Sequence, residues 1–198
     1  MQLPLVNSVM KPLALGILLS LAHPSIAEVA APGNYRVDPD HSTILFAVNH
    51  LGTSVLTGRF NTFEGSFALD PDQTPRVDVS IKTASVDTNH EKRDAHLRSP
   101  DFFNVKQFPV MRFVADKVDY DTHGQPTTLH GKLSLHGKTK PVALDLSPIG
   151  AGKDPWGGYR AGFNAKTVLK RSDFGMDFMP GGIGDEITVT LNIEAIKE

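Results

Sequence analysis

Three neighbouring ionisable side chains near the middle of the sequence, Arg93, Asp94 and His96, have the chemistry of a binding site. Guanidinium groups bind carboxylate and phosphate oxygens, and a nearby His can add a hydrogen bond. Arg171, which lies close to Asp173, is a second candidate of this kind. We therefore predict Arg93, His96 and Arg171 as contacts for the polar head group of a ligand. Structural ion pairs, Arg93 with Asp94 and Arg171 with Asp173, are the simpler alternative.

Other residues with catalytic or metal-binding chemistry lack the necessary spacing. The sequence has no Cys, which excludes thiol catalysis, disulfides and Cys-ligated zinc. His90 and His96 do not have the spacing that would offer both to a metal from one helix, and no HExxH motif occurs. No Ser lies in a G-x-S-x-G elbow, and residues 181–184 lack the Lys of a phosphate-binding loop. We expect no catalytic residues, no metal site and no cofactor, and thus a binding protein and not an enzyme.

The N-terminus has the pattern of a secretory leader. Lys11 precedes an apolar stretch at 13–22, which is typical of a signal peptide and too short to span a membrane. Small residues at Ser25 and Ala27 suit a cleavage site, so we expect a signal peptide at 1–27 and a mature domain at 28–198. An uncleaved anchor or a buried helix is the alternative. The formal net charge of −2 and the lack of a basic run give no sign of nucleic-acid binding.

Most of the mature sequence alternates apolar and polar residues, the pattern of strands that bury one face. The alternation recurs in about eight segments with short polar connections, which predicts an antiparallel sandwich or a closed barrel. A barrel is favoured because it leaves no long exposed edge. Ser99-Pro100-Asp101 is a helix-start signal within this pattern, and the glycine-rich segment 150–158 is expected to be a loop.

Several ordered motifs in these segments give the sequence a resemblance to the YceI-like family of lipid- or polyisoprenoid-binding proteins. The similarity runs from Tyr35 to the C-terminus. The motifs are V-D-P-D-H-S-T-I-L-F-A-V-N-H at 37–50, G-R-F-N-T-F-E-G-S-F at 58–67, R-D-A-H-L-R-S-P-D-F-F at 93–103, F-P-V-M-R-F at 108–113, G-K-L-S-L-H-G-K-T-K-P-V at 131–142 and R-S-D-F-G-M at 171–176. The resemblance implies an all-β fold, an extended eight-stranded antiparallel lipocalin-like β-barrel with a short helical element around an apolar tunnel.

Strand parity then predicts which side chains line such a tunnel. An eight-stranded barrel is just wide enough to be filled by side chains or to hold one small ligand, and core packing accounts for many of the 11 Phe residues. A register error in any strand would invert its set. The predicted wall consists of Phe46, Val48, Phe63, Phe67, Val79, Ile81, Phe113, Leu133, Leu135, Phe163 and Leu169, with Phe102 and Phe103 closing one end.

The functional expectation that follows is a periplasmic carrier, a monomer or a homodimer. Family resemblance implies that its cargo is a polyisoprenoid, an isoprenoid quinone or a fatty-chain lipid. A quinone-binding redox accessory to a membrane cytochrome b561-type protein is the second interpretation, and it requires that cytochrome as a partner. An enzyme that acts on the bound lipid is the third, and it requires that the ligand be consumed.

Overall fold

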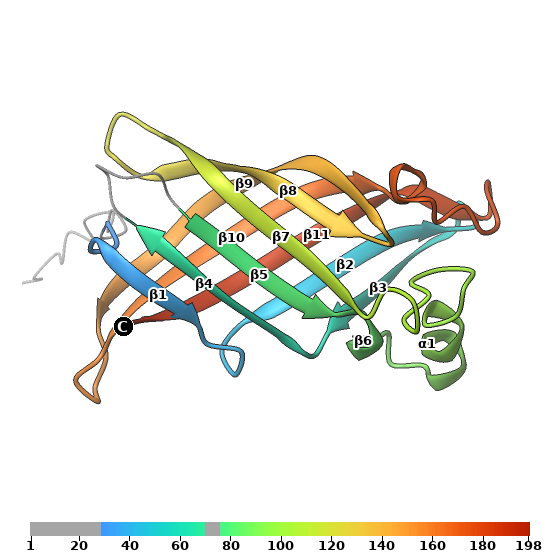
Figure 1. Ribbon diagram of the computed structural model, residues 1–198, viewed down its shortest axis with the longest axis horizontal. Coiled ribbons are helices and arrows are strands. Elements are labelled where there is room, and N and C mark those ends of the chain that lie inside the picture. The colour runs from blue at the N-terminus through green and yellow to red at the C-terminus, as the bar shows by residue number, and fades with distance from the viewer. Residues whose placement is uncertain (1–28, 70–75) are drawn as a thin grey trace, which may run out of the picture.

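The alternating segments of the sequence pair edge to edge into an antiparallel sheet that closes on itself (Figure 1). The computed structural model describes residues 29–69 and 76–198, so the predicted signal peptide at 1–27 lies outside the described residues. The strands are β1 Gly33–Val37, β2 Thr43–His50, β3 Ser54–Phe60, β4 Phe63–Leu69, β5 Arg76–Lys82, β6 Val86–Asp87, β7 Val110–Tyr120, β8 Pro126–Leu135, β9 Lys138–Lys153, β10 Tyr159–Lys170 and β11 Ile183–Lys197. The helical elements are the 3-10 helix η1 Thr83–Ser85, the α-helix α1 Glu91–Leu97 and the 3-10 helix η2 Arg171–Phe174.

The barrel closes because the last strand pairs back with the first. The ring runs β1-β4-β5-β7-β8-β9-β10-β11, and β11 returns to β1. β11 is long enough to pair with β1 near its C-terminal end and with β2 near its N-terminal end, so β1 and β2 form one interrupted wall strand. β4 and β3 continue each other in the same way, as the partners of β1 and β2. The expected eight-stranded antiparallel barrel is confirmed.

The short helix lies earlier in the chain than the sequence indicated. At the start of α1, Nδ1 of His90 accepts a hydrogen bond from the Arg93 N–H at 3.2 Å. The expected start at Ser99-Pro100-Asp101 is wrong, because these residues follow the helix. Proline disfavours helical backbone at the residue before it, so Pro100 opposes continuation of α1. His is not among the preferred N-cap residues, so the residue at the true start is a weak sequence signal.

The glycine-rich segment 150–158 is shorter as a loop than expected. β9 extends into the segment as far as Lys153 and β10 begins at Tyr159, so only residues 154–158 connect them. Oδ1 of Asp154 organises the turn by accepting hydrogen bonds from the backbone N–H groups of Trp156 at 2.9 Å and Gly158 at 2.8 Å. The prediction of a loop over the whole segment is wrong, because Gly150 and Gly152 belong to β9 and pair with β10.

The two ends of the barrel carry different elements. α1, β6, the β2–β3 turn and the β10–β11 connector lie at one end, on the right in Figure 1, which we call the α1 end. The β9–β10 turn and the C-terminus lie at the opposite end. A backbone hydrogen bond of 2.8 Å from Leu51 to Gly182 joins the β2–β3 turn to the connector. Within residues 29–69 and 76–198, no helix has the length and apolar character to cross a membrane.

Candidate ligand-binding cavity

A cavity of about 610 Å³ lies inside the barrel. Much of its wall is made by inward-facing side chains of the barrel strands, since successive side chains of a strand point to opposite faces. On β10, for example, Phe163, Ala165, Thr167 and Leu169 reach the cavity. The volume is within the range of small-molecule binding pockets, roughly 300–1,000 Å³.

The structure places the predicted wall residues on this cavity with one exception. Those that line it are Phe46, Val48, Phe67, Val79, Ile81, Phe102, Phe103, Phe113, Leu133, Leu135, Phe163 and Leu169. Phe63 does not line it; this side chain is 8% exposed and packs in the buried core. Strand parity identifies inward-facing residues, but it does not separate a core position from a wall position. Contact of the wall residues with a ligand stays a prediction.

Sequence reasoning missed several other parts of the wall, among them β9, the last strand and the β10–β11 connector. The last strand shows a clear alternation that could have identified its inward face, whereas the residues around the β10–β11 connector have no periodic signal. Only the closure of the barrel brings both beside β2 and β10. The additional lining residues from these two parts are Phe174, Met176, Phe178, Met179, Ile183, Ile187, Val189, Leu191 and Ile193.

The polar side chains of the cavity wall gather at the α1 end. His50 is the last residue of β2, Thr167 lies close to the end of β10, and Arg171 is the first residue of η2. The remaining three belong to α1 or to the segment just before it. Among the residues that the structure describes, no carboxylate side chain belongs to the wall. The polar wall residues are His50, Thr88, Arg93, His96, Thr167 and Arg171.

Thr88 fixes the position of Arg93. Nε of Arg93 donates to Oγ1 of Thr88, and Nη2 donates to the Thr88 carbonyl, both at 2.7 Å. Thr88 in turn donates to Oδ1 of Asp94 from its N–H at 2.9 Å and from its hydroxyl at 2.5 Å. The expected direct ion pair between Arg93 and Asp94 is wrong, because Thr88 stands between the two charges. Nη1 of Arg93 makes no hydrogen bond to any residue of the described part of the chain.

His96 lies in a small aromatic cluster at the same end. Its ring packs edge to face against Phe102, with centroids 5.1 Å apart, and against Phe178, at 5.0 Å. Nε2 of His96 hydrogen-bonds to Oδ2 of Asp101 at 2.7 Å. Because Phe178 comes from the β10–β11 connector, this cluster joins the connector to the segment around α1.

Arg171 has a structural role in the connector. Its guanidinium donates to the carbonyls of Gly184 and Ile183, each at 3.0 Å, and to that of Met176. The residue is 6% exposed. The expected ion pair with Asp173 is wrong, since the described residues hold Arg171 through carbonyl groups and not through a carboxylate. Each nitrogen of the Arg171 guanidinium thus already donates a hydrogen bond within the protein.

Comparison with known proteins identifies the family. A family model, the YceI-like domain, matches residues 35–195. The chain belongs to the YceI-like family. A UPF0312 protein of Pseudomonas aeruginosa is 43% identical over 191 residues, covering 94% of this chain and 96% of the relative. A UPF0312 protein of Photorhabdus laumondii is 43% identical over 177 residues, covering 87% and 91% of the two chains.

Solved structures share the YceI-like barrel. The YceI protein of Campylobacter jejuni is 30% identical with a TM-score of 0.65, covering 76% of this chain and 90% of that chain. BcnA of Burkholderia cenocepacia is 20% identical with a TM-score of 0.69, covering 80% and 98%. A polyisoprenoid binding domain from Saccharophagus degradans is 15% identical with a TM-score of 0.65, covering 83% and 98%. At these identities, the last two likenesses show the fold alone.

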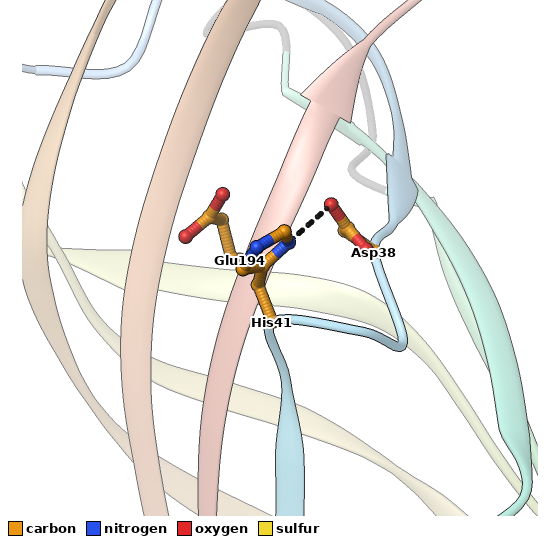
Figure 2. Close-up of side chains that lie close together, drawn as sticks. All are labelled: Asp38, His41 and Glu194. Carbon is orange, nitrogen blue, oxygen red and sulfur yellow. Dashed lines mark hydrogen bonds and ion pairs between the residues drawn. The ribbon is translucent and has the colours of Figure 1, made fainter. Parts of the chain in front are cut away.

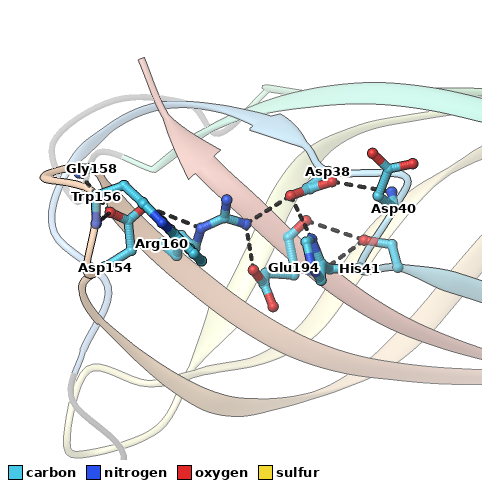
Figure 3. Close-up of polar contacts among 9 residues, drawn as sticks. Asp38, Asp40, His41, Asp154, Trp156, Gly158, Arg160 and Glu194 are labelled. Carbon is cyan, nitrogen blue, oxygen red and sulfur yellow. Dashed lines mark hydrogen bonds and ion pairs between the residues drawn. The ribbon is translucent and has the colours of Figure 1, made fainter.

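The YceI-like barrel also carries a polar cluster away from the cavity. Asp38 and His41 flank the β1–β2 turn, and Glu194 approaches them from β11 (Figure 2). These three side chains are close enough to share a metal ion. However, Nη1 of Arg160 donates to Oδ2 of Asp38 at 2.7 Å and to Oε1 of Glu194 at 2.5 Å, and Nε donates to Asp154 at 3.2 Å (Figure 3). The guanidinium thus already binds both carboxylates, and the donor set fits an ion-pair network better than a metal centre.

The pKa values of this cluster reflect the same contacts. Hydrogen bonds from Arg160 and His41 hold the pKa of Asp38 at about 2, against an ordinary value of 3.8, although burial acts in the opposite direction. The hydrogen bond to Asp38 raises the pKa of His41. Asp38 is therefore a carboxylate at neutral pH, and the cluster fastens the β1–β2 turn to β10 and β11.

Proposed function

We propose that this protein is a periplasmic carrier that binds a polyisoprenoid or another long-chain amphiphilic lipid inside its barrel. The observation that carries the proposal is the cavity. It has a volume of about 610 Å³, aliphatic and Phe side chains form most of its wall, and its polar side chains lie at one end. This distribution matches a molecule with a long apolar chain and a single polar head.

The energetics of an apolar chain favour such a container. Moving hydrocarbon out of water is worth about 0.8 kcal/mol for each buried methylene. A wall without hydrogen-bonding groups provides that gain along the chain and requires no specific contact. The described wall offers no nucleophile–base pair of the kind that covalent catalysis needs, which favours binding over catalysis.

Two other features support the proposal. The neighbour from Saccharophagus degradans is named for polyisoprenoid binding, so the shared fold is one that this name associates with such a ligand. Export to the periplasm rests on the leader sequence at 1–27, with its Lys11 and its short apolar stretch.

The direct test is native mass spectrometry of the protein purified from the periplasm of its own source, followed by denaturing extraction and identification of the lipid. A stoichiometric polyprenyl or fatty-chain mass is the expected result. A stoichiometric quinone that a membrane cytochrome reduces or oxidises would favour the redox accessory. Conversion of the bound lipid during incubation would favour an enzyme. An empty protein that also rejects added polyprenyl lipids would contradict the carrier.

A matched pair of variants tests where the lipid binds. Phe163 lines the cavity and packs edge to face on Phe67, with centroids 5.9 Å apart, whereas the next residue, Asn164, is exposed on the outer face. Phe163→Asp is expected to abolish lipid binding, because it places a charge in the apolar wall. Asn164→Asp adds the same charge outside and is expected to bind normally. Intact binding by Phe163→Asp, with an unchanged circular dichroism spectrum, would contradict the wall assignment.

A further inference from the structure

The two ends of the cavity differ in the polarity of their described wall residues. All of the polar side chains that the described residues contribute to the cavity wall come from elements at the α1 end. At the opposite end, the wall is made of residues such as Leu69, Val118, Leu129 and Ile193, which offer no side-chain hydrogen bond. Within the described wall, the head group of a bound lipid finds hydrogen-bonding side chains at the α1 end. The chain points away from α1, and the head lies beside it.

The cavity also reaches the surface at the α1 end. Phe178 and Met179 of the β10–β11 connector line the cavity, yet they are 37% and 47% exposed. A head group at this end can consequently remain close to water while the chain is buried. This placement avoids the cost of carrying a polar group through the apolar interior.

Among the described residues, the wall at the α1 end carries hydrogen-bond donors and no carboxylates. Arginine has five N–H donors and no acceptor, and Nη1 of Arg93 is uncommitted among the described residues. Asp94 and Asp101, the carboxylates bonded to residues of this end, do not line the cavity and are already engaged. Asp94 accepts both hydrogen bonds from Thr88, and Asp101 binds Nε2 of His96.

Arg171 adds a second positive charge to the same end of the wall. Its neighbour Asp185 accepts hydrogen bonds from the N–H and the hydroxyl of Ser172, at 3.0 and 2.8 Å. These bonds, with a smaller contribution from the charge of Arg171, lower the pKa of Asp185, but Asp185 makes no hydrogen bond to the guanidinium. Two cations thus face the cavity, and neither has a carboxylate partner in the wall. An ammonium head group would find like charge and no anionic partner there, whereas an oxyanion would find free N–H donors.

We propose that the head group of the lipid is an oxyanion, a carboxylate or a phosphate, and that Arg93 binds it through its free Nη1. Arg171 contributes charge and holds the connector, while its hydrogen bonds stay within the protein. The inference rests on the proposed function, because it requires a lipid chain in the barrel. It adds that the protein selects cargo by head-group charge and discriminates against amines.

Ligands with one chain and different heads test this selection. The probes are hexadecanoic acid, hexadecyl phosphate, hexadecan-1-ol and hexadecylamine, each used to displace a fluorescent apolar dye from the protein. A charge-assisted hydrogen bond predicts that the acid or the phosphate binds about 10- to 100-fold more tightly than the alcohol, with the amine weakest. The anion with the higher affinity shows whether the site prefers a carboxylate or a phosphate head group.

Equal affinity for the amine and the acid would overturn the inference and leave lipid binding intact. Failure of all four probes to bind would instead contradict the proposed function itself. The two failures are therefore distinguishable in one experiment on the unmodified protein.

A variant tests the role of Arg93. Arg93→Gln is expected to lose the preference for the acid while its affinity for the alcohol changes less than about twofold. Arg112→Gln is the matched control, because Arg112 is exposed and paired with Asp78 away from the cavity wall. Should Arg93→Gln fold normally by circular dichroism and keep the full preference for the acid, the assignment to Arg93 would be wrong.

Discussion

Replacing Ala165 with Phe should close the cavity from inside without damaging the barrel. Ala165 lies on β10 between Leu146 and Leu191, is 5% exposed and lines the cavity. A phenyl ring at this position enters space that already exists. We therefore expect the variant to fold with undiminished stability and to bind lipid poorly.

The magnitude follows from the chain segment that the ring displaces. A phenyl ring fills the space of about four methylenes, each worth about 0.8 kcal/mol on burial. Excluding that segment costs about 3 kcal/mol, which is roughly 100-fold in affinity. In a close-packed core, the same substitution would instead lower the free energy of unfolding by about 1–3 kcal/mol through overpacking.

The assay combines dye displacement by a polyprenyl lipid with urea denaturation. Val168→Phe is the control, because Val168 lies on the same strand and is 54% exposed. It should leave both affinity and stability near those of the parent protein. A destabilised Ala165→Phe that retains full affinity would refute the reasoning, since it would mean that Ala165 borders packed core and not ligand space.

Three more perturbations follow from the same structure. Asp38→Asn, which weakens the tie to Arg160, should lower the free energy of unfolding by about 2 kcal/mol at neutral pH in urea denaturation. The pKa of Asp38 is about 2 in the folded protein and about 3.8 in the unfolded chain, so this stabilisation is complete above pH 3.8 and is lost as the pH falls through 2. Variant and parent should therefore have the same stability at the lowest pH, and a difference that stays constant with pH would contradict the assignment. Phe174→Ala empties a core site only 1% exposed and should cost about 3–5 kcal/mol in the same measurement, with a loss below about 1 kcal/mol counting against a packed site. Phe178→Ala removes the exposed ring that packs on His96 and should speed lipid release in stopped-flow mixing with little change in stability, whereas an unchanged rate would show that this ring does not limit exit.

The local pattern of the sequence was enough for the strands and for much of the cavity wall, while the resemblance to the YceI-like family supplied the eight-stranded barrel. Alternation along β10 put Phe163 and Leu169 on one face, and barrel closure then turned that face inward. The same rule wrongly placed Phe63 on the cavity wall, because parity predicts which face of the sheet a side chain occupies but not whether other side chains separate it from the cavity. The helix was misplaced for a related reason: His90 acts as a cap only because its ring meets the Arg93 N–H in the folded segment.

What the sequence by itself determined is the set of two-faced strands, and the cost of open edges favoured their closure into a barrel over a sandwich. This information is local, since a period of two residues needs no knowledge of the rest of the chain. Only the tertiary structure decided which charges meet. It replaced the ion pair expected between neighbours, Arg93 and Asp94, with a contact through Thr88. It also brought Arg160 to Asp38, which is 122 positions away in the chain. Such partners are chosen by strand register and barrel closure, and no residue spacing in the sequence records them.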